Sequence, residues 1–373
     1  MEHYDIIIIG AGLAGLTAAI DLRKKNHRVL VFEKNTFPNH KVCGEYVSNE
    51  VRPYLESLGV GIPHSSANID TFTLSTINGK TITTRLPLGG FGISRYALDN
   101  LLYEKALASG VAFIFQAVDA IAFEDSFFEI TTLKGQIYRA PFVIGAFGKR
   151  SNLDKNMKRA FIAKKSPWLG VKAHYDYQGF PENEVALHNF NGGYAGLSKT
   201  ETGAVNFCYL TSYKSFQKER NITSFNEKVV AQNPVLNTFL KKAKPIFDEP
   251  LSIAQISFEQ KKAAEDHVIM CGDSAGLIHP LCGNGMAMAV HSAKIASELI
   301  DKYINENGYD RQKFEKMYTL QWNEAFKKRL WAGRQLQSLL LNKGVSKLGM
   351  SLIVGAPGLL SRVIRATHGQ PIV

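Results

Sequence analysis

A chain of 373 residues is long enough for one large domain or two interleaved ones and too short for several. Its 45% hydrophobic and 21% charged residues are typical of a folded globular protein and exclude a disordered or fibrous chain. The formal net charge of +11 indicates affinity for anions, such as nucleotides, acidic proteins or anionic lipids, without choosing among them.

The four cysteines indicate free thiols. Cys43, Cys208, Cys271 and Cys282 have neither the spacing of a disulfide framework nor that of a zinc site, so we expect no metal. Cys208 and Cys271 stand in apolar, strand-like segments and are predicted core residues. A reducing, cytoplasmic compartment fits this usage best.

The sequence shows no export signal and no membrane span. The first residues lack a basic segment and run directly into a predicted nucleotide site, which cleavage of a signal peptide would destroy. No apolar run reaches the roughly 20 residues that a membrane-spanning helix needs. We therefore expect a soluble cytoplasmic protein, or one peripheral to the inner face of the membrane.

The first strong pattern is a glycine turn between a strand and a helix. Residues 6–9 are four isoleucines, typical of a strand buried on both faces, and they lead into the G-x-G-x-x-G turn of Gly10, Gly12 and Gly15. Helical spacing follows, and a second strand over residues 28–32 ends at Glu33. This order is that of a dinucleotide-binding fold.

Each of these residues has a physical role in such a fold. Gly10 allows the tight turn, Gly12 lets backbone N–H groups approach a pyrophosphate, and Gly15 lets the helix pack against the strand. Glu33 would accept hydrogen bonds from the ribose hydroxyls of adenosine. The alternative, a glycine-rich turn without a ligand, is disfavoured because strand, helix and acid are all present. The predicted site also includes Leu13, Ala14 and Lys34.

The middle of the chain predicts a second, antiparallel sheet. Residues 71–88 alternate with period two around Asn78 and Gly79, which indicates a hairpin. Residues 94–108 have helical spacing. Further alternating segments occur near 170–177, 184–188, 204–210 and 250–258, and we expect their sheet to cover a bound cofactor.

A second glycine-bearing turn identifies the dinucleotide. An apolar strand ends at Asp273, a loop with Pro280 follows, and Gly283 and Gly285 open an apolar helix. A carboxylate and a helix N-terminus would then meet the far end of a ligand whose adenosine lies at residues 10–33. NAD does not need this remote site, whereas FAD, with its ribityl chain and flavin ring, does.

The C-terminal part is predicted to be helical. Residues 310–342 have helical spacing with scattered basic residues. Residues 348–364 mix apolar side chains with Gly and Pro, and Arg362 and Arg365 stand at their end. A helix pair that closes a pocket is favoured here, and a basic amphipathic edge resting on lipid is the alternative.

With Lys-Val-Cys-Gly-Glu at 41–45 and Ser-Arg-Tyr-Ala-Leu-Asp at 94–99, the chain resembles the FAD-dependent oxidoreductases of the p-hydroxybenzoate hydroxylase fold, and most of all the geranylgeranyl reductase family. The resemblance spans residues 1 to about 300, loosely between 152 and 260. It implies an α/β fold with a Rossmann-like FAD-binding domain, an interleaved antiparallel β-sheet substrate domain and C-terminal helices. The expected boundaries are 1–70, 95–155 and 262–305 for the FAD-binding domain, 71–94 and 156–261 for the substrate domain, and 306–373 for the helical region.

The resemblance also implies which residues contact FAD. Arg95 would neutralise phosphate, Asp273 would accept from ribityl hydroxyls, and the helix opening at Gly285 would face the flavin edge where charge accumulates on reduction. Cys43 is the catalytic candidate, because its thiol would lie beside the flavin and could donate a proton; the alternative is a small side chain that fills a tight loop. His279 is a weaker proton-donor candidate. The implied contacts are Ala14, Glu33, Cys43, Gly44, Arg95, Val118, Asp273, Gly285 and Met286.

Two departures from the family pattern bear on the reaction. The usual Ala-Asp-Gly is Ala-Phe-Gly at 146–148, so a carboxylate tied to FAD and reduced nicotinamide in hydroxylases is lost, and Phe147 is expected only to pack under a loop. Of the Tyr-x-Trp-x-Phe-Pro signature of geranylgeranyl reductases only Tyr194 remains, and it is the candidate substrate residue. The halogenase signature Trp-x-Trp-x-Ile-Pro is absent, and the isolated Trp168 is expected in a core or pocket wall.

Together these patterns predict an FAD-dependent oxidoreductase. In the leading hypothesis, reduced flavin transfers hydride to a carbon–carbon double bond of a prenyl, polyene or polyketide-like substrate, carried by another protein or by a membrane. The alternatives are a monooxygenase of an aromatic or polyketide substrate and a non-catalytic electron carrier. The chain has one dinucleotide-binding half, so electrons would come from transient NAD(P)H or from an acidic, ferredoxin-like protein. No nucleic-acid partner is expected.

Overall fold

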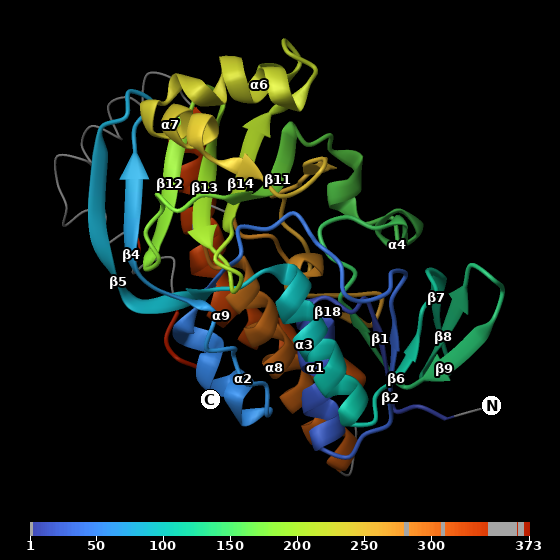
Figure 1. Ribbon diagram of the computed structural model, residues 1–373. Helices are drawn as coiled ribbons and strands as arrows, with labels where there is room; N and C mark the ends of the chain where they lie inside the picture. The colour runs from blue at the N-terminus through green and yellow to red at the C-terminus, as the bar shows by residue number, and fades with distance from the viewer. Residues whose placement is uncertain (1–2, 280–282, 307–309, 342–363, 365–368) are drawn as a thin grey trace.

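The structure, a computed structural model, describes residues 3–279, 283–306, 310–341, 364 and 369–373. Within these residues the strands form three sheets: a mostly parallel sheet of six strands, a mixed sheet of nine strands and a small antiparallel sheet of three. We call them the parallel, large and small sheets. Figure 1 shows the large sheet stacked over the layer that contains the parallel sheet and its helices.

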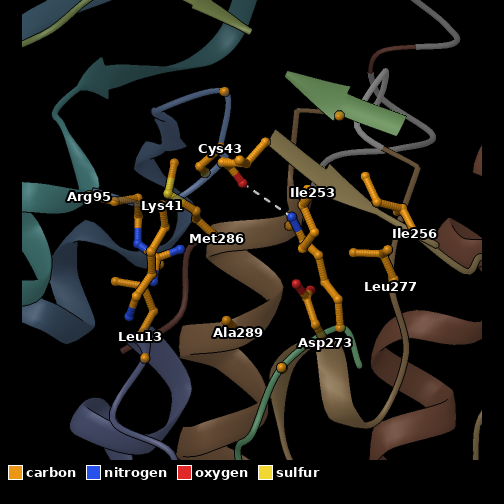
Figure 2. A pocket seen from close by; sticks show the side chains of 18 of the residues that line it. Leu13, Lys41, Cys43, Arg95, Ile253, Ile256, Asp273, Leu277, Met286 and Ala289 are labelled. Carbon is orange, nitrogen blue, oxygen red and sulfur yellow. Dashed lines mark hydrogen bonds between the residues drawn. The ribbon is translucent and has the colours of Figure 1, made fainter. Parts of the chain in front are cut away.

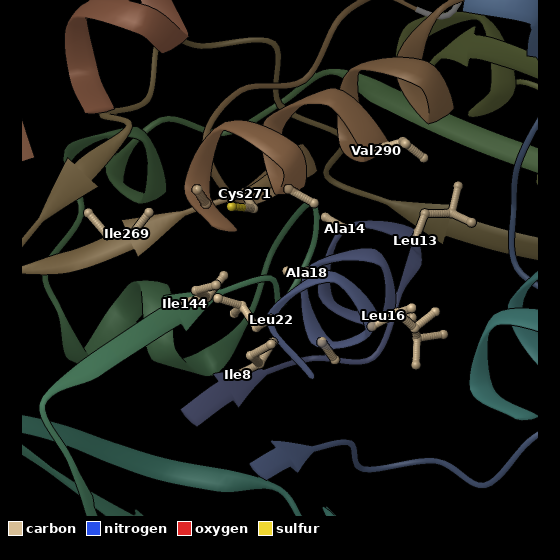
Figure 3. Close-up of a cluster of buried hydrophobic side chains, with 14 of the residues drawn as sticks. Ile8, Leu13, Ala14, Leu16, Ala18, Leu22, Ile144, Ile269, Cys271 and Val290 are labelled. Atoms are coloured by element: carbon tan, nitrogen blue, oxygen red, sulfur yellow. The ribbon is translucent and has the colours of Figure 1, made fainter. Parts of the chain in front are cut away.

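The parallel sheet is built around the four isoleucines of β1. They are fully or almost fully buried because β1 pairs in parallel with β10 on one side and β2 on the other, so no face is left for polar residues. Helices α1 (Leu13–Lys24) and α8 (Gly285–Asn305) cover one face, and their apolar side chains interdigitate with those of β1, β10 and β18 (Figure 3). The strand order is β17 (Ala264–Glu265), β18 (Val268–Met270), β10 (Phe142–Gly145), β1 (Ile6–Ile9), β2 (Val29–Phe32) and β6 (Ala112–Ile114).

The large sheet contains the predicted hairpin. β4 (Ala67–Ser75) and β5 (Thr81–Gly92) pair antiparallel around the Asn78-Gly79 turn, which confirms that prediction. β3 (Tyr46–Ser48) adds to the outer side of β5, although it lies within the predicted range 1–70 of the other domain, and the domain division stays a prediction. The remaining strands are β11 (Trp168–Asp176), β12 (Glu184–Phe190), β13 (Gly193–Lys199), β14 (Val205–Ser212), β15 (Lys244–Pro245) and β16 (Leu251–Ala254).

The two faces of the large sheet have different partners. Alternate residues such as Tyr175 and Phe207 pack against Phe225 and Phe239 of the helices at the outer face. Residues one position away, including Lys172, point toward the loop of residues 41–45. Since side chains alternate along a strand, the register decides which residues reach the candidate site. The outer helices are α5 (Tyr213–Phe216), α6 (Ile222–Lys228) and α7 (Pro234–Lys242).

The small sheet and the remaining helices complete the fold. The small sheet consists of β7 (Val118–Glu124), β8 (Phe127–Thr132) and β9 (Ile137–Ala140). The helices are α1 (Leu13–Lys24), α2 (Arg52–Ser57), α3 (Arg95–Ala108), α4 (Asn152–Asn156), α8 (Gly285–Asn305) and α9 (Arg311–Leu341), with 3-10 turns at Asn49–Val51, Ala160–Ala163, Val230–Gln232 and Gly272–Ser274. Among the described helices, we find none with the length and hydrophobicity that a bilayer-spanning segment needs. Of the predicted C-terminal segment 348–364, only the buried Ile364 lies within the described residues.

Candidate functional site

A cavity of about 1060 Å³ lies between the glycine turns and the large sheet. It is larger than the 300–1,000 Å³ of most small-molecule sites. Gly15 is not among the described residues that line it, and Pro280 lies outside the described residues. The predicted site residues that line it are Gly10, Gly12, Leu13, Ala14, Glu33, Lys34, Cys43, Gly44, Arg95, Val118, Tyr194, Asp273, Gly283, Gly285 and Met286.

At Gly10 and Gly15, the packing of the glycine turn itself excludes any larger residue. Gly10 has φ 101°, and a Cβ there would lie 2.4 Å from the carbonyl oxygen of Ala146. A Cβ on Gly15 would lie 1.9 Å from the carbonyl oxygen of Gly10. Packing within the chain therefore requires both glycines.

Gly12 and Gly44 are different, because nothing in the described part of the chain crowds them. Among the described residues, a Cβ on Gly12 would meet only Arg95 Nη2, at 3.7 Å, and one on Gly44 would have no heavy atom within 4 Å. A small residue at these two positions leaves room for a group that binds along the backbone. This is the cradle that a dinucleotide with a flavin ring would fill, so the residues present fit FAD.

The end of the cavity next to β2 is organised by Glu33. Its carboxylate accepts hydrogen bonds from the backbone N–H groups of Ala11 at 2.9 Å and Lys34 at 2.9 Å, which ties the end of β2 to the glycine turn. Arg150 also lines the cavity, and its Nη1 atom is buried without a hydrogen-bond partner within the described residues. Sequence reasoning missed Arg150, although it closely follows Phe147, where the family's carboxylate is absent.

Beside Gly12, Arg95 belongs to a buried charge cluster. Its Nε and Nη2 atoms donate to Asp99 at 2.7 and 2.8 Å, and Lys41 Nζ donates to the same carboxylate at 2.8 Å. Burial alone would raise the pKa of Asp99, but the charges of Arg95 and Lys41 outweigh burial and hold that pKa below its ordinary value. Two cations share one anion here, so the cluster keeps a positive charge at the N-terminus of α1, which suits a pyrophosphate.

The loop of residues 41–45 is clamped to the large sheet through Glu45. This residue is buried, has φ 55°, and accepts hydrogen bonds from Lys172 Nζ, from His174 Nε2 at 2.6 Å and from the backbone N–H of Arg95 at 2.7 Å. Burial would raise the pKa of Glu45, but the hydrogen bond from His174 and the charge of Lys172 hold it below the ordinary value. A left-handed backbone at a non-glycine residue persists where the surroundings over-determine it, as they do here.

The same face of the sheet also holds the loop backbone. Asn206 Nδ2 donates to the carbonyl of Cys43 at 3.2 Å, and Ser198 Oγ donates to the carbonyl of Gly44 at 3.1 Å. Cys43 is half-buried, lines the cavity, and interacts with the Arg95 guanidinium. Figure 2 shows Cys43 on the same side of the view as Lys41 and Arg95, away from Ile256 and Leu277. The clamp therefore fixes where the Cys43 thiol is presented.

Potential metal ligands occur in the same clamp. One ligand atom each of His40, Glu45 and His174 lies within 4.8 Å of the others. Both carboxylate oxygens of Glu45 already accept hydrogen bonds, and the ammonium of Lys172 would repel a cation. We therefore interpret the group as the anchor of the loop.

The opposite wall carries Asp273 and the start of α8. Figure 2 shows Asp273 across the cavity from Arg95, with Met286 and Ala289 of α8 between them. Lys261 Nζ holds the Asp273 segment by donating to its backbone carbonyl at 2.7 Å, and burial lowers the pKa of Lys261 to about 8. Sequence reasoning missed Lys261, because the contact joins two segments with no common pattern.

Beyond Cys43 the cavity walls become apolar. Tyr194 is buried there, and Phe147 is half-buried at the cavity wall and packs against the main core. Trp168 is buried, as expected, in the core beside this region. The apolar wall consists of Phe72, Leu74, Leu86, Val185, Leu187, Tyr194, Leu210, Ile253, Ile256, Leu277 and Ile364.

Two expectations about single residues need correction or refinement. Cys208 was predicted in the core, but it is half-buried and lines the cavity, because the register turns it to the inner face of the sheet. Cys271 is buried as expected.

His279 is buried among the rings of Trp168, Tyr194 and Phe258. Burial lowers the pKa of His279 to about 3, so its imidazole is neutral near pH 7 and is not poised as an imidazolium donor.

Comparisons with known proteins agree with this geometry. A family model described as FAD binding domain matches residues 3–311. Digeranylgeranylglycerophospholipid reductase of Methanosarcina acetivorans is 27% identical over 351 residues, which are 87% of this chain and 81% of that protein.

Solved structures share the fold. Flavin-dependent brominase Bmp2 superposes with a TM-score of 0.78 at 18% identity, over 98% of this chain and 93% of the other. A geranylgeranyl bacteriochlorophyll reductase-like protein from Thermoplasma acidophilum gives a TM-score of 0.74 at 18% identity, over 99% and 93%. With the cradle at Gly12 and Gly44 and the family match over most of its length, the chain belongs to the FAD binding domain family and is an FAD-dependent oxidoreductase.

Proposed function

We propose that the protein reduces a carbon–carbon double bond of a hydrophobic, prenyl-type substrate. The observation that carries this proposal is the continuity of the cavity, which runs from the glycine turns past Cys43 into the apolar region around Leu187 and Leu277. A polar substrate would leave its hydrogen-bonding groups unsatisfied against such walls. The relative named digeranylgeranylglycerophospholipid reductase supports the same substrate class.

The residues divide the work. FAD held in the cavity would, once reduced, supply a hydride for one carbon of the double bond. The Cys43 thiol supplies the proton to the other carbon, so that the two carbons together gain one hydride and one proton. The Arg95 guanidinium stabilises the thiolate that remains until a solvent proton replaces the lost one. The apolar wall excludes water and holds the chain of the substrate.

We propose that each predicted contact residue binds the part of FAD that the sequence analysis assigned to it. Gly12, Leu13 and Ala14 would hold the pyrophosphate together with Arg95, and Glu33, Lys34 and Val118 would surround the adenosine. Asp273 would bind the ribityl chain. Gly44, Gly283, Gly285 and Met286 would surround the flavin ring. Electrons would come from NAD(P)H that binds transiently or from an acidic ferredoxin-like protein, which the surplus of eleven positive charges would attract.

A single-turnover experiment without oxygen tests the proposal. The holoprotein is reduced anaerobically and mixed with digeranylgeranylglycerophospholipid, and flavin absorbance and product mass are followed. A reductase reoxidises its flavin and adds two hydrogen atoms to the lipid. Product that forms only after oxygen is admitted would establish a monooxygenase instead, and reoxidation by partner proteins without any lipid product would establish an electron carrier.

A matched pair of thiol variants tests the role of Cys43. Cys43→Ser is expected to keep FAD and to slow lipid reduction at least tenfold, because a hydroxyl is a much weaker acid. Cys208→Ser changes a second half-buried thiol among the described residues of the same cavity and is expected to keep the rate. Equal rates for Cys43→Ser and the unmodified protein would leave Cys43 with a packing role.

A further inference from the structure

Helix α9 carries apolar side chains on two opposite sides. Its inner side is buried, as expected for a helix that packs on α8. Its outer side nevertheless carries large apolar residues: Leu320 is 55% exposed and Trp331 is 59% exposed. Eleven residues separate them, which is close to three helical turns, so they lie on one line along the helix. The inner side consists of Phe314, Tyr318, Trp322, Phe326 and Leu330.

The same outer side is basic. Lys313, Lys316, Lys327 and Lys328 are exposed, and helical spacing places them on either side of the line through Leu320 and Trp331. Glu324 is the one exposed acid among the described exposed residues of α9. We define the outer face of α9 as Lys313, Lys316, Met317, Leu320, Glu324, Lys327, Lys328 and Trp331.

The small sheet provides the comparison that indicates what the outer face binds. It also exposes apolar side chains, among them Leu133, which is 69% exposed. Its exposed charges are mixed, with the acids Asp119, Glu124 and Asp125 against the bases Lys134 and Arg139, so this surface has no surplus of positive charge to attract an anionic partner. Apolar residues combined with a surplus of lysine occur on the outer face of α9, and this combination is complementary to an anionic lipid surface.

We propose that the outer face of α9 docks the protein on the surface of an anionic bilayer. The lysines are attracted to lipid headgroups, with about a fivefold gain in affinity for each lysine near the surface, and Trp331 and Leu320 enter the interfacial layer. The inner side of the same helix lies close to the cavity. A Cβ on Gly276 would lie 2.9 Å from the Trp322 ring, and the next residue, Leu277, lines the apolar wall. Docking would thus bring that wall within about one helix diameter, roughly 10 Å, of lipid.

Vesicle binding tests the proposal without any turnover. The holoprotein is mixed with vesicles of phosphatidylcholine alone or with 30% phosphatidylglycerol, and flotation is measured at low and high salt. Binding is expected with the anionic vesicles and is expected to fall at high salt. The double variant Lys327→Glu/Lys328→Glu should bind at least tenfold more weakly. Lys241→Glu/Lys242→Glu on α7 makes the same change of charge at another exposed lysine pair and should bind as the unmodified protein does.

Tryptophan emission provides a reading from the proposed face itself. Trp168 and Trp322 are buried, so a change on vesicle binding reports Trp331. A blue shift is expected with anionic vesicles, and it should be absent in Trp331→Phe, which keeps its FAD. Equal binding to neutral vesicles, equal loss in the two lysine variants, or an unshifted emission of the bound protein would overturn the proposal. Saturable binding of an acidic ferredoxin to this face, together with no measurable binding to vesicles, would also overturn the proposal.

Discussion

The clamp on the loop of residues 41–45 predicts a large effect of one conservative change. Glu45→Gln keeps the size and shape of the side chain but removes its charge. Lys172 is fully buried, and its ammonium donates to Glu45, so the variant leaves a buried cation without its anion. Glutamine still accepts one hydrogen bond, but its amide N–H₂ group meets the donors of Lys172, His174 and Arg95.

The size of the effect follows from burial. Removing one partner of a buried ion pair costs about 3–5 kcal/mol, which is a large part of the roughly 5–15 kcal/mol by which a domain is stable. Glu45 also holds a left-handed backbone, and its loop carries Cys43 and Gly44. We therefore expect Glu45→Gln to lose about 3 kcal/mol of unfolding free energy and most of its bound FAD.

Urea unfolding followed by circular dichroism, together with the ratio of FAD to protein, measures both effects. Glu129→Gln is the matched control, because Glu129 also pairs with a cation, Arg139 at 2.7 Å, but the two side chains are 36% and 62% exposed. Such a surface pair contributes about 0–1 kcal/mol. Glu45→Gln/Lys172→Met removes both charges and should recover part of the loss. A Glu45→Gln variant within 1 kcal/mol of the unmodified protein would refute the idea of an electrostatic clamp.

Three further outcomes are expected. Gly12→Ala should fold as the unmodified protein does and bind FAD at least tenfold more weakly, whereas Gly10→Ala should lose stability in the apoprotein as well, measured by urea unfolding and FAD titration. Burial lowers the pKa of His188 to about 4 from an ordinary value near 6.5, so the unfolded chain binds a proton in this interval while the native protein does not. His188 alone should therefore lower stability by at most about 1.4 kcal/mol per pH unit as pH drops from 6.5 to 4, and His188→Asn should reduce the dependence of the urea midpoint on pH by that share. Arg329→Met leaves the buried Glu50 without its cation at 3.0 Å and should lower the urea midpoint and the FAD content together, since Glu50 also accepts from Asn284 at the start of α8.

Local patterns were sufficient for the elements that depend on neighbours in sequence. The isoleucine strand, the glycine turn and the hairpin at Asn78-Gly79 are each determined by residues that lie close together in sequence. All three are present in the structure. β13, residues 193–199, was not predicted, because Gly193, Ala195 and Gly196 interrupt the alternation of polar and apolar residues. Its place comes from pairing with β12 and β14 on either side.

Contacts between distant segments could not be read in the same way. The resemblance pointed to Cys43 and Gly44 but not to Lys172 or His174, which reach Glu45 from far along the chain. Cys208 was misplaced for the same reason: its neighbours in sequence are apolar, and only the register of β14 between β11 and β13 decides which face it joins. Sequence patterns show that a strand exists, whereas pairing determines what it presents.

That register also explains how one sheet face serves two kinds of ligand. Side chains opposite one another on β11, β14 and β13 form rows across the sheet. The first row donates hydrogen bonds to the loop of residues 41–45, the second provides the clamping ammonium and the second thiol, and the third has no charged group and contributes to the apolar wall. The rows are His174, Asn206 and Ser198; then Lys172, Cys208 and Gly196; then Gly170, Leu210 and Tyr194. Because adjacent rows on one face are only about 7 Å apart, donors that fix the loop and a surface that excludes water can lie side by side, and the middle row, with Cys208, marks the boundary between them.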